Sequence, residues 1–259
     1  MRFCSLGSGS SGNATLIEAR SITKVTRVLV DCGFALKELT RRLARRGLGP
    51  DNLDALFITH EHGDHVGCAL ALSRRHQVPV WMSRGTWLAI GSPPMEAGLL
   101  HFARDGELIE IGDIGLTPYT VPHDAAEPLQ LTVSDGVSKL GLLTDAGSLT
   151  AHLRQALERC TGILLECNHD SSLLAASSYH ASLKARVGGP LGHLANHVAA
   201  QLLAECRHTG LRHVVAAHLS LQNNRPELAA TALAGALETG RDDIIVADAA
   251  LGFDWLGLN

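Results

Sequence analysis

Four side chains of the kinds that bind metal ions lie within six consecutive residues of this sequence. The string His-Glu-His-Gly-Asp-His contains His60, His62, Asp64 and His65. Three imidazoles and a carboxylate satisfy one another's hydrogen bonds poorly when they are buried together. Divalent cations take neutral imidazole nitrogen and carboxylate oxygen as their usual ligands. The spacing therefore predicts a metal site, and the alternative is an exposed polar loop.

The elements around this string indicate how it is positioned. It follows a predicted buried strand, Leu53–Thr59, so residues 60 and 62 can face one way while 64 and 65 face a second position. Other predicted strands are Arg2–Leu6, Thr15–Glu18, Val25–Val30, Val78–Met82, Gly162–Cys167, Leu211–Ala217, Asp243–Asp248 and Gly252–Leu256, with hairpins in 106–121 and 129–143. Predicted helices are Ala35–Arg46, Val66–His76, Gly85–Ile90, Leu149–Cys160, Leu194–His208 and Pro226–Leu237. Two β-rich halves with interspersed helices predict two packed sheets with helices outside them.

Composition sets broad limits on the protein. The chain has 259 residues, 46% of them hydrophobic, and no repeat or linker divides it, so residues 1–259 are expected to form one domain. A net charge of −4 means that any nucleic-acid contact must come from a local basic patch. The six cysteines form no C-x-x-C pair, the N-terminal segment lacks an apolar signal-peptide core, and no apolar run reaches about 20 residues. We therefore expect a cytoplasmic protein with reduced thiols and no membrane contact.

The six-residue string resembles the signature of the metallo-β-lactamase superfamily. The resemblance implies an α/β fold in which two mixed sheets form an αββα sandwich with helices on the outer faces. It also implies three further ligands at strand ends, which match His123, Asp145 and His218. The resemblance implies that His60, His62 and His123 bind one metal. It implies that Asp64, His65 and His218 bind the other, and that Asp145 bridges both.

Two cations held in this way would share a water and lower its pKa toward neutrality, so that a bridging hydroxide acts as the nucleophile of a hydrolase. Asp64 has a second expected catalytic role, which is to hold that hydroxide as well as its metal. Because the expected bridge is Asp145 and not a cysteine, no thiolate demands a soft metal. Zn²⁺ is the first expectation by ligand type, and Mn²⁺ or Fe²⁺ also fits.

Within the superfamily, the sequence resembles the YycJ/WalJ-type exonuclease branch over essentially the whole chain. The segments that carry this resemblance are Leu6–Ala14, Leu164–Asp170, Tyr179–Val187, Gly192–Asn196 and Leu219–Asn224. The resemblance implies a phosphodiesterase that degrades DNA from 5′ to 3′ and takes part in DNA repair. Gly63, Cys167 and Ala195 stand where that branch usually has serine, which leaves the substrate preference open.

A second pair of residues is expected to act in catalysis. Glu166 and His193 occupy places similar to a Glu and a His that lie beside the metals in ribonuclease Z nucleases. We expect His193 to protonate the leaving oxygen and Glu166 to orient it, because an alkoxide leaves poorly without an acid. The alternative is that His193 only caps the following helix. His169 and Asp170 are expected either to support the ligands or to form a turn, and residues 7–13 either to hold a phosphate or only to turn the chain.

Lys37, Arg41 and Arg45 recur at four-residue spacing, with Arg42 and Arg46 beside them, and form one basic helix face. This face is either ordinary solvated surface or a patch that follows the phosphates of a nucleic acid, with DNA more expected than RNA.

Two other functions remain open at this point. One is hydrolysis of a small ester, thioester or lactam, which would use the same metal ligands. The other is non-catalytic, metal-dependent binding of nucleic acid. The polarity of digestion, exonuclease against endonuclease action and the oligomeric state are not determined by the sequence.

Overall fold

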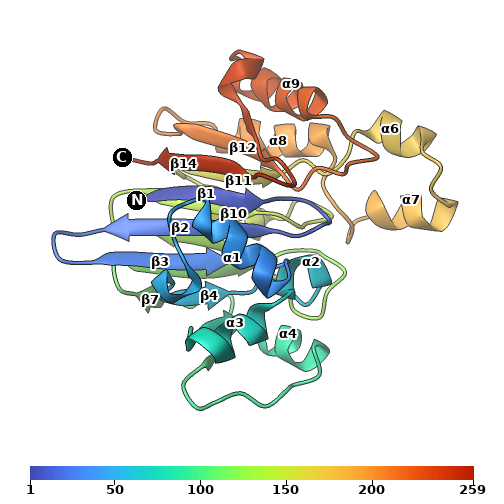
Figure 1. Cartoon of the computed structure of the whole chain (residues 1–259). Coiled ribbons are helices and arrows are strands. Elements are labelled where there is room, and N and C mark those ends of the chain that lie inside the picture. Colours follow the sequence, from blue (N-terminus) through green and yellow to red (C-terminus); the bar gives the residue numbers. More distant parts are fainter.

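Two seven-stranded sheets pack face to face in the computed structural model, which describes residues 1–259, and helices cover their outer faces (Figure 1). The expected αββα sandwich is therefore confirmed. Each sheet contains three antiparallel and three parallel strand pairs, so both are mixed. No helix is long and apolar enough to cross a bilayer.

The first sheet is built mostly from the first hundred residues and closes with the last strand of the chain. Its strand order is β14-β1-β2-β3-β4-β5-β6. The bounds are β1 Arg2–Gly7, β2 Ala14–Arg20, β3 Val25–Val30, β4 Ala55–Phe57, β5 Val80–Met82, β6 Leu100–Phe102 and β14 Phe253–Gly257. Because β14 pairs with β1, the two ends of the chain lie side by side (Figure 1).

The second sheet takes the middle and later strands in the order β13-β12-β11-β10-β9-β8-β7. Their bounds are β7 Ile109–Ile111, β8 Ile114–Thr120, β9 Leu129–Ser134, β10 Lys139–Leu143, β11 Gly162–Glu166, β12 His213–Ala217 and β13 Ile245–Val246. The parallel strands β10, β11 and β12 are almost continuously apolar, as expected for strands that are buried on both faces.

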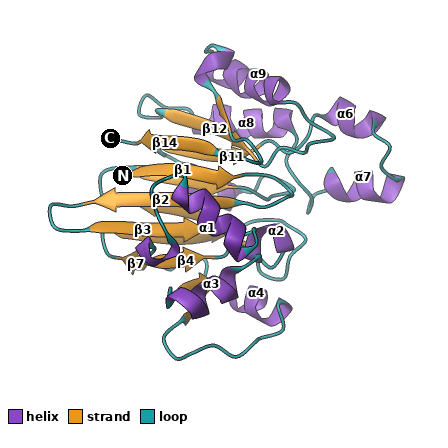
Figure 2. Cartoon of the chain, viewed as in Figure 1, coloured by secondary structure: helices purple, strands orange, loops and turns teal.

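Helices complete the sandwich (Figure 2). Their bounds are α1 Leu36–Ala44, α2 Gly63–Val66, α3 Ala69–His76, α4 Arg84–Ala89, α5 Ala151–Leu157, α6 Ser171–Ala176, α7 Ala181–Val187, α8 Asn196–Cys206 and α9 Pro226–Leu237, with short 3₁₀ turns at Pro50–Asn52 and Arg241–Asp243. Leu39 and Leu72 of α1 and α3 pack on the first sheet, and Leu202 and Leu233 of α8 and α9 pack on the second. A third apolar cluster fills the space between the sheets.

The secondary structure predicted from the sequence differs from the observed structure in three places. The helix predicted over Val66–His76 begins only at Ala69, as α3, and Val66 ends the separate helix α2. The chain breaks between them because Gly67 has φ of +30° and a Cβ there would collide with the carbonyl oxygen of Cys32. Strand β6 was not predicted. Helices α6 and α7 were also missed, since α7 buries no residue and so has no apolar stripe, and the pair projects from the sandwich (Figure 1).

Candidate metal centre

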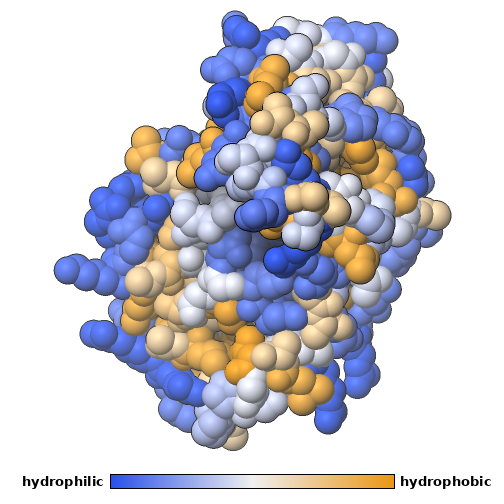
Figure 3. Space-filling model, turned by 90° about the vertical axis from the view of Figure 1, so that its right-hand side faces the viewer, coloured by the Kyte–Doolittle hydropathy of each residue, from blue (hydrophilic) through white to orange (hydrophobic).

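All seven predicted ligands gather at one edge of the sandwich, beside α2 and α7 in Figure 1. They come from the loops after β4, β8, β10 and β12 and from the start of α2: His60, His62, Asp64, His65, His123, Asp145 and His218. In Figure 3 this face is hollowed near its centre, and hydrophilic side chains surround the hollow. Residues up to 158 positions apart in the sequence thus meet because parallel strands end at the same edge of a sheet.

The first triad consists of His60, His62 and His123. The Nδ1 atom of His62 lies 3.0 Å from Nε2 of His60 and 3.3 Å from Nε2 of His123. His60 and His123 are buried, while His62 is partly exposed. Three imidazole nitrogens that approach one another this closely must share a proton or a cation, and their arrangement fits the triad expected for one metal.

The second triad consists of Asp64, His65 and His218. The Oδ2 atom of Asp64 lies 3.6 Å from Nε2 of His65 and 3.5 Å from Nε2 of His218. Both imidazoles are buried, and the carboxylate is partly exposed. One oxygen and two nitrogens around a common point match the ligand set expected for the other metal.

Asp145 lies between the two triads. Its Oδ2 atom is 2.8 Å from Nε2 of His65, and its Oδ1 atom is 4.0 Å from Nε2 of His123. One buried polar atom of the cluster, Nε2 of His218, has no hydrogen-bond partner. A buried atom of this kind is costly unless something binds it, so the cluster fits a pair of divalent cations.

Burial and neighbouring charges shift the pKa values of the cluster in both directions. Burial lowers the pKa of His60 well below its ordinary value and also lowers that of His123, so both are neutral and can offer a lone pair. Burial alone would lower the pKa of His65, but the Asp145 and Asp31 carboxylates raise it to about 10. The cationic surroundings of Asp145, chiefly His218 and His65, outweigh its burial and hold its pKa well below the usual range.

A second layer of acceptors fixes the orientation of the histidines. Nδ1–H of His65 donates to Asp31 at 2.7 Å, Nδ1–H of His123 to the Gly192 carbonyl at 3.0 Å, and Nδ1–H of His218 to the Thr144 carbonyl at 2.6 Å. Each bond fixes the ring so that Nε2, its other nitrogen, faces the expected metal position, as outer acceptors do in metal sites.

Asp31 was not among the residues selected from the sequence, and its only signal there is a carboxylate at a strand end. The structure gives it a clear supporting role. It is buried, and it also accepts hydrogen bonds from the amide and hydroxyl of Thr59. Asp31 and His218 both have positive φ, 62° and 54°, a region that non-glycine residues seldom adopt. Such backbone strain tends to concentrate at functional sites.

Comparison with known proteins agrees with this geometry. The family model of the metallo-beta-lactamase superfamily matches residues 7–178. The exodeoxyribonuclease WalJ of Streptococcus pneumoniae is 32% identical over 88% of this chain and 85% of its own length. The exodeoxyribonuclease YycJ of Bacillus anthracis is 31% identical over 92% of this chain and 89% of its own.

The chain belongs to the metallo-beta-lactamase superfamily. The expectation of a hydrolase of this superfamily that is similar to the YycJ and WalJ exonucleases is thereby confirmed. Among solved structures, the metallo-beta-lactamase fold protein YhfI from Bacillus subtilis superposes with a TM-score of 0.74 at 15% identity, covering 99% of both chains. At that identity the likeness shows the fold alone.

His193 and Glu166 lie together at this metallo-beta-lactamase centre. Nδ1–H of His193 is 2.7 Å from Oε1 of Glu166 and 3.0 Å from Oδ1 of Asp145. Glu166 is fully buried and is held by the amides of Ala146 and Leu194. The alternative that His193 caps the next helix is wrong, because the residue before the first turn of α8 is Ala195. Its Nδ1 atom faces the carboxylates, so Nε2 is the nitrogen left for the cavity.

The cavity over the centre has a volume of about 430 Å³. Its walls include ligand side chains, Ser10 of the N-terminal loop, and Leu183, Arg186 and Val187 of α7. Arg186 is the only lysine or arginine in the lining, and its Nε atom donates to Asp124 at 2.6 Å. The sequence singled out the Arg186 segment only as a family marker, because nothing local shows that α7 folds back over the candidate metal centre.

The remaining sequence hypotheses concern the loop 7–13 and the pair His169 and Asp170. In the loop, the amide and side chain of Asn13 donate to the carbonyl oxygen of Asp64, so the loop supports a predicted ligand besides turning the chain. Asp170 accepts the amides of the first turn of α6 and acts as its N-cap. His169 pairs with Ala195 in an isolated β-bridge, and no hydrogen bond joins His169 or Asp170 to a predicted ligand.

The basic face of α1 is largely occupied by protein acceptors. Arg41 and Arg42 bind Glu38, and Arg42 also donates to the Leu6 carbonyl. Arg45 donates to the Ala250 carbonyl, and Arg46 to the Phe253 carbonyl. These bonds attach α1 to the first strand and to the C-terminal segment, which favours a structural role over the phosphate-binding patch.

Proposed function

We propose that this chain is a dinuclear metal phosphodiesterase that degrades DNA as a 5′-to-3′ exonuclease, with residues 1–259 acting as one domain. The observation that carries the proposal is the convergence of two ligand triads around Asp145. The names of the relatives, which match along nearly the whole chain, support DNA as the substrate. Two divalent ions, Zn²⁺ first by ligand type and Mn²⁺ or Fe²⁺ next, would supply an activated water and neutralise the charge of the phosphate.

The protein's own residues have distinct tasks in this proposal. Asp64, His65 and His218 would hold one ion, and the three other histidines would hold the second, with Asp145 contacting both. Asp64 is partly exposed toward the cavity, so it is also placed to orient the attacking water. The buried second layer keeps these side chains rigid and ready for the substrate.

His193 is the proposed general acid. Its imidazole lines the cavity, and its side chain is 24% exposed. Burial alone would lower its pKa, but Glu166 and Asp145 raise it to about 9, so the ring carries a proton near neutral pH. Glu166 orients the ring through Nδ1, and Nε2 can then donate its proton to the departing alkoxide oxygen, a contribution of about 10²- to 10⁴-fold.

Arg186 is proposed to contact a phosphate of the substrate. Its side chain is 63% exposed at the rim of the cavity, and its bond to Asp124 uses Nε. The two terminal nitrogens are therefore free to form paired hydrogen bonds with phosphate oxygens, the geometry that arginine favours.

The test is a panel of substrates incubated with Mn²⁺- or Zn²⁺-loaded protein: end-labelled single- and double-stranded DNA, RNA, a thioester and nitrocefin. We expect DNA to be shortened from its 5′ end. His193→Ala should lower this rate about 10²-fold or more with full metal content, whereas His197→Ala, an exposed histidine on α8, should leave it unchanged. Cleavage of only the thioester or nitrocefin would reject the proposal and favour the small-molecule hydrolase.

A further inference from the structure

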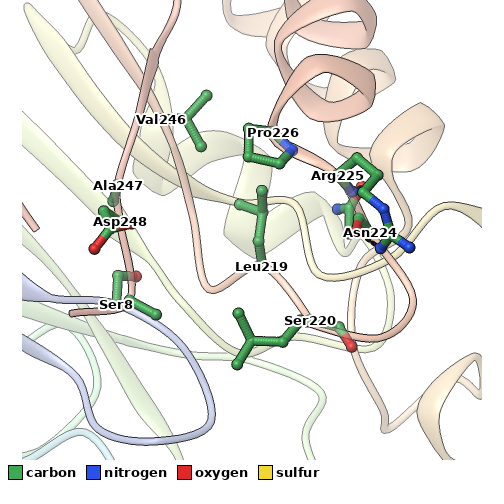
Figure 4. Close-up of a pocket in the computed structure, with 11 residues that line it drawn as sticks. Ser8, Leu219, Ser220, Asn224, Arg225, Pro226, Val246, Ala247 and Asp248 are labelled. Atoms are coloured by element: carbon green, nitrogen blue, oxygen red, sulfur yellow. Dashed lines mark hydrogen bonds between the residues drawn. The ribbon is translucent and has the colours of Figure 1, made fainter.

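A second cavity lies beside the metal centre. It has a volume of about 320 Å³ and is formed by the loop after β12, the start of α9 and the segment from β13 toward β14 (Figure 4). Leu219, Pro226 and Val246 supply apolar walls, and Ser8 lies at one side of the cavity. This volume is within the range of small-molecule sites.

The lining combines apolar surface with a few polar groups at the edge. Leu221 is 78% exposed at the rim and offers apolar surface to an occupant. Arg225 and Asp248 bring opposite charges to the rim, and both are exposed. An occupant with a flat apolar face and hydrogen-bonding edges would match these walls.

This cavity and the metal cavity share their dividing wall. Ser8 lines the second cavity, whereas Ser10, two residues later in the same loop, lines the metal cavity. Likewise, Leu219 lines the second cavity, while the adjacent His218 lines the metal cavity. The hydroxyl of Ser8 accepts the amide N–H of His218 at 2.9 Å, so the wall of one cavity is bonded directly to a proposed ligand of the other.

We infer that this second cavity binds a nucleobase of the substrate strand, from a nucleotide close to the phosphate that is cleaved. The inference rests on the proposed nuclease function. A phosphate at the metals leaves the neighbouring nucleotides of the strand within reach of the adjoining cavity. Leu219, Pro226 and Val246 would contact the faces of the base, because every base has an apolar face that can be buried without sequence preference.

The experiment uses the metal-loaded full chain and single-stranded DNA that carries one abasic residue, moved stepwise along the first nucleotides from the digested end. We expect a drop in kcat/KM of about tenfold, equivalent to about 1.4 kcal/mol, at one position only. Val246→Trp, which fills the cavity, should lower kcat/KM on intact DNA by about the same factor and remove the sensitivity to the abasic position, with metal content unchanged.

Two further variants make the test independent of folding problems. Leu221→Ala removes exposed surface only and should lower kcat/KM about twofold to threefold, again only when the base is present. Val137→Trp, in the exposed turn after β9 and away from both cavities, is the matched control and should behave as the unaltered protein.

A crosslinking experiment checks the location directly. The metal-loaded His193→Ala variant, which is expected to cleave slowly, is irradiated with DNA that carries 5-bromouracil at the sensitive position, and crosslinks are expected within 219–226 or 246–249. DNA digestion with no abasic sensitivity and no such crosslink would overturn the inference while the nuclease function stands. Absence of DNA digestion altogether would instead reject the proposed function. Crosslinking of a second protein chain to this cavity, with no base there, would assign it to a protein partner and also overturn the inference.

Discussion

Substitution of Asp31 by Asn should weaken one metal site and spare the other. The Oδ1 atom of Asp31 accepts the Thr59 amide at 2.9 Å, and its Oδ2 atom accepts Nδ1–H of His65 at 2.7 Å. In Asp31→Asn the single remaining oxygen stays with the Thr59 amide, so an NH₂ group faces Nδ1 of His65. That imidazole must then move its proton to Nε2, the atom that would bind the metal.

The size of the effect follows from the loss of one supporting partner. Loss of an outer acceptor typically reduces metal affinity about 10- to 100-fold, which is about 1.4–2.8 kcal/mol. The loss should fall only on the ion held by Asp64, His65 and His218. The triad of His60, His62 and His123 does not contact Asp31 and should keep its affinity.

Isothermal titration of metal-free protein with Zn²⁺, together with metal analysis after dialysis against a graded chelator, would resolve the two sites. Asp54→Asn is a matched control, because Asp54 also accepts a strand amide, that of Arg27, and lies outside the metal cavity. If Asp31→Asn binds two equivalents with unaltered affinities, or loses both ions equally, the tautomer argument is refuted.

Three further predictions concern the cavity rim, the ions and a distant ion-pair cluster. Arg186→Ala should raise KM for DNA severalfold with a smaller change in kcat, whereas Lys184→Ala, on the same helix but outside the lining, should change neither in steady-state assays. Chelation should lower the melting temperature by about 10–20 °C, since two ions, each at about 100 times its Kd, stabilise by about 2.7 kcal/mol apiece, and calorimetry should show recovery when Zn²⁺ is restored. Burial would raise the pKa of Glu18, but Arg2, Arg20 and Arg27 outweigh it and lower that pKa below 4.5. The ion pairs of Glu18 therefore stabilise the folded state above pH 4.5, and this stabilisation is lost as the pH falls through the lowered pKa. Glu18→Gln should therefore cost about 1–2 kcal/mol near neutral pH, and an equal loss in denaturant titrations at low pH would contradict the assignment.

Short-range patterns in the sequence predicted most of the strands and the ligand string from His60 to His65, whereas His123, Asp145 and His218 were expected from the family resemblance. The string from His60 to His65 is contiguous, and the strands before it and before Asp145 and His218 are apolar runs that can be recognised individually. Elements without a local signal were missed: α7 buries no residue, and the break at Gly67 depends on a distant carbonyl oxygen.

The sequence by itself determined which side chains can bind metal and that each follows a strand. Only the tertiary structure decided which groups support them, because strand order and the packing of the sheets are set by contacts between distant residues. The bond of Asp31 to His65, the position of Arg186 over the cavity and the link from Ser8 to His218 all join segments that are separated along the chain. No local pattern encodes such pairs, since hydrogen-bond partners across a fold depend on the final geometry of both segments.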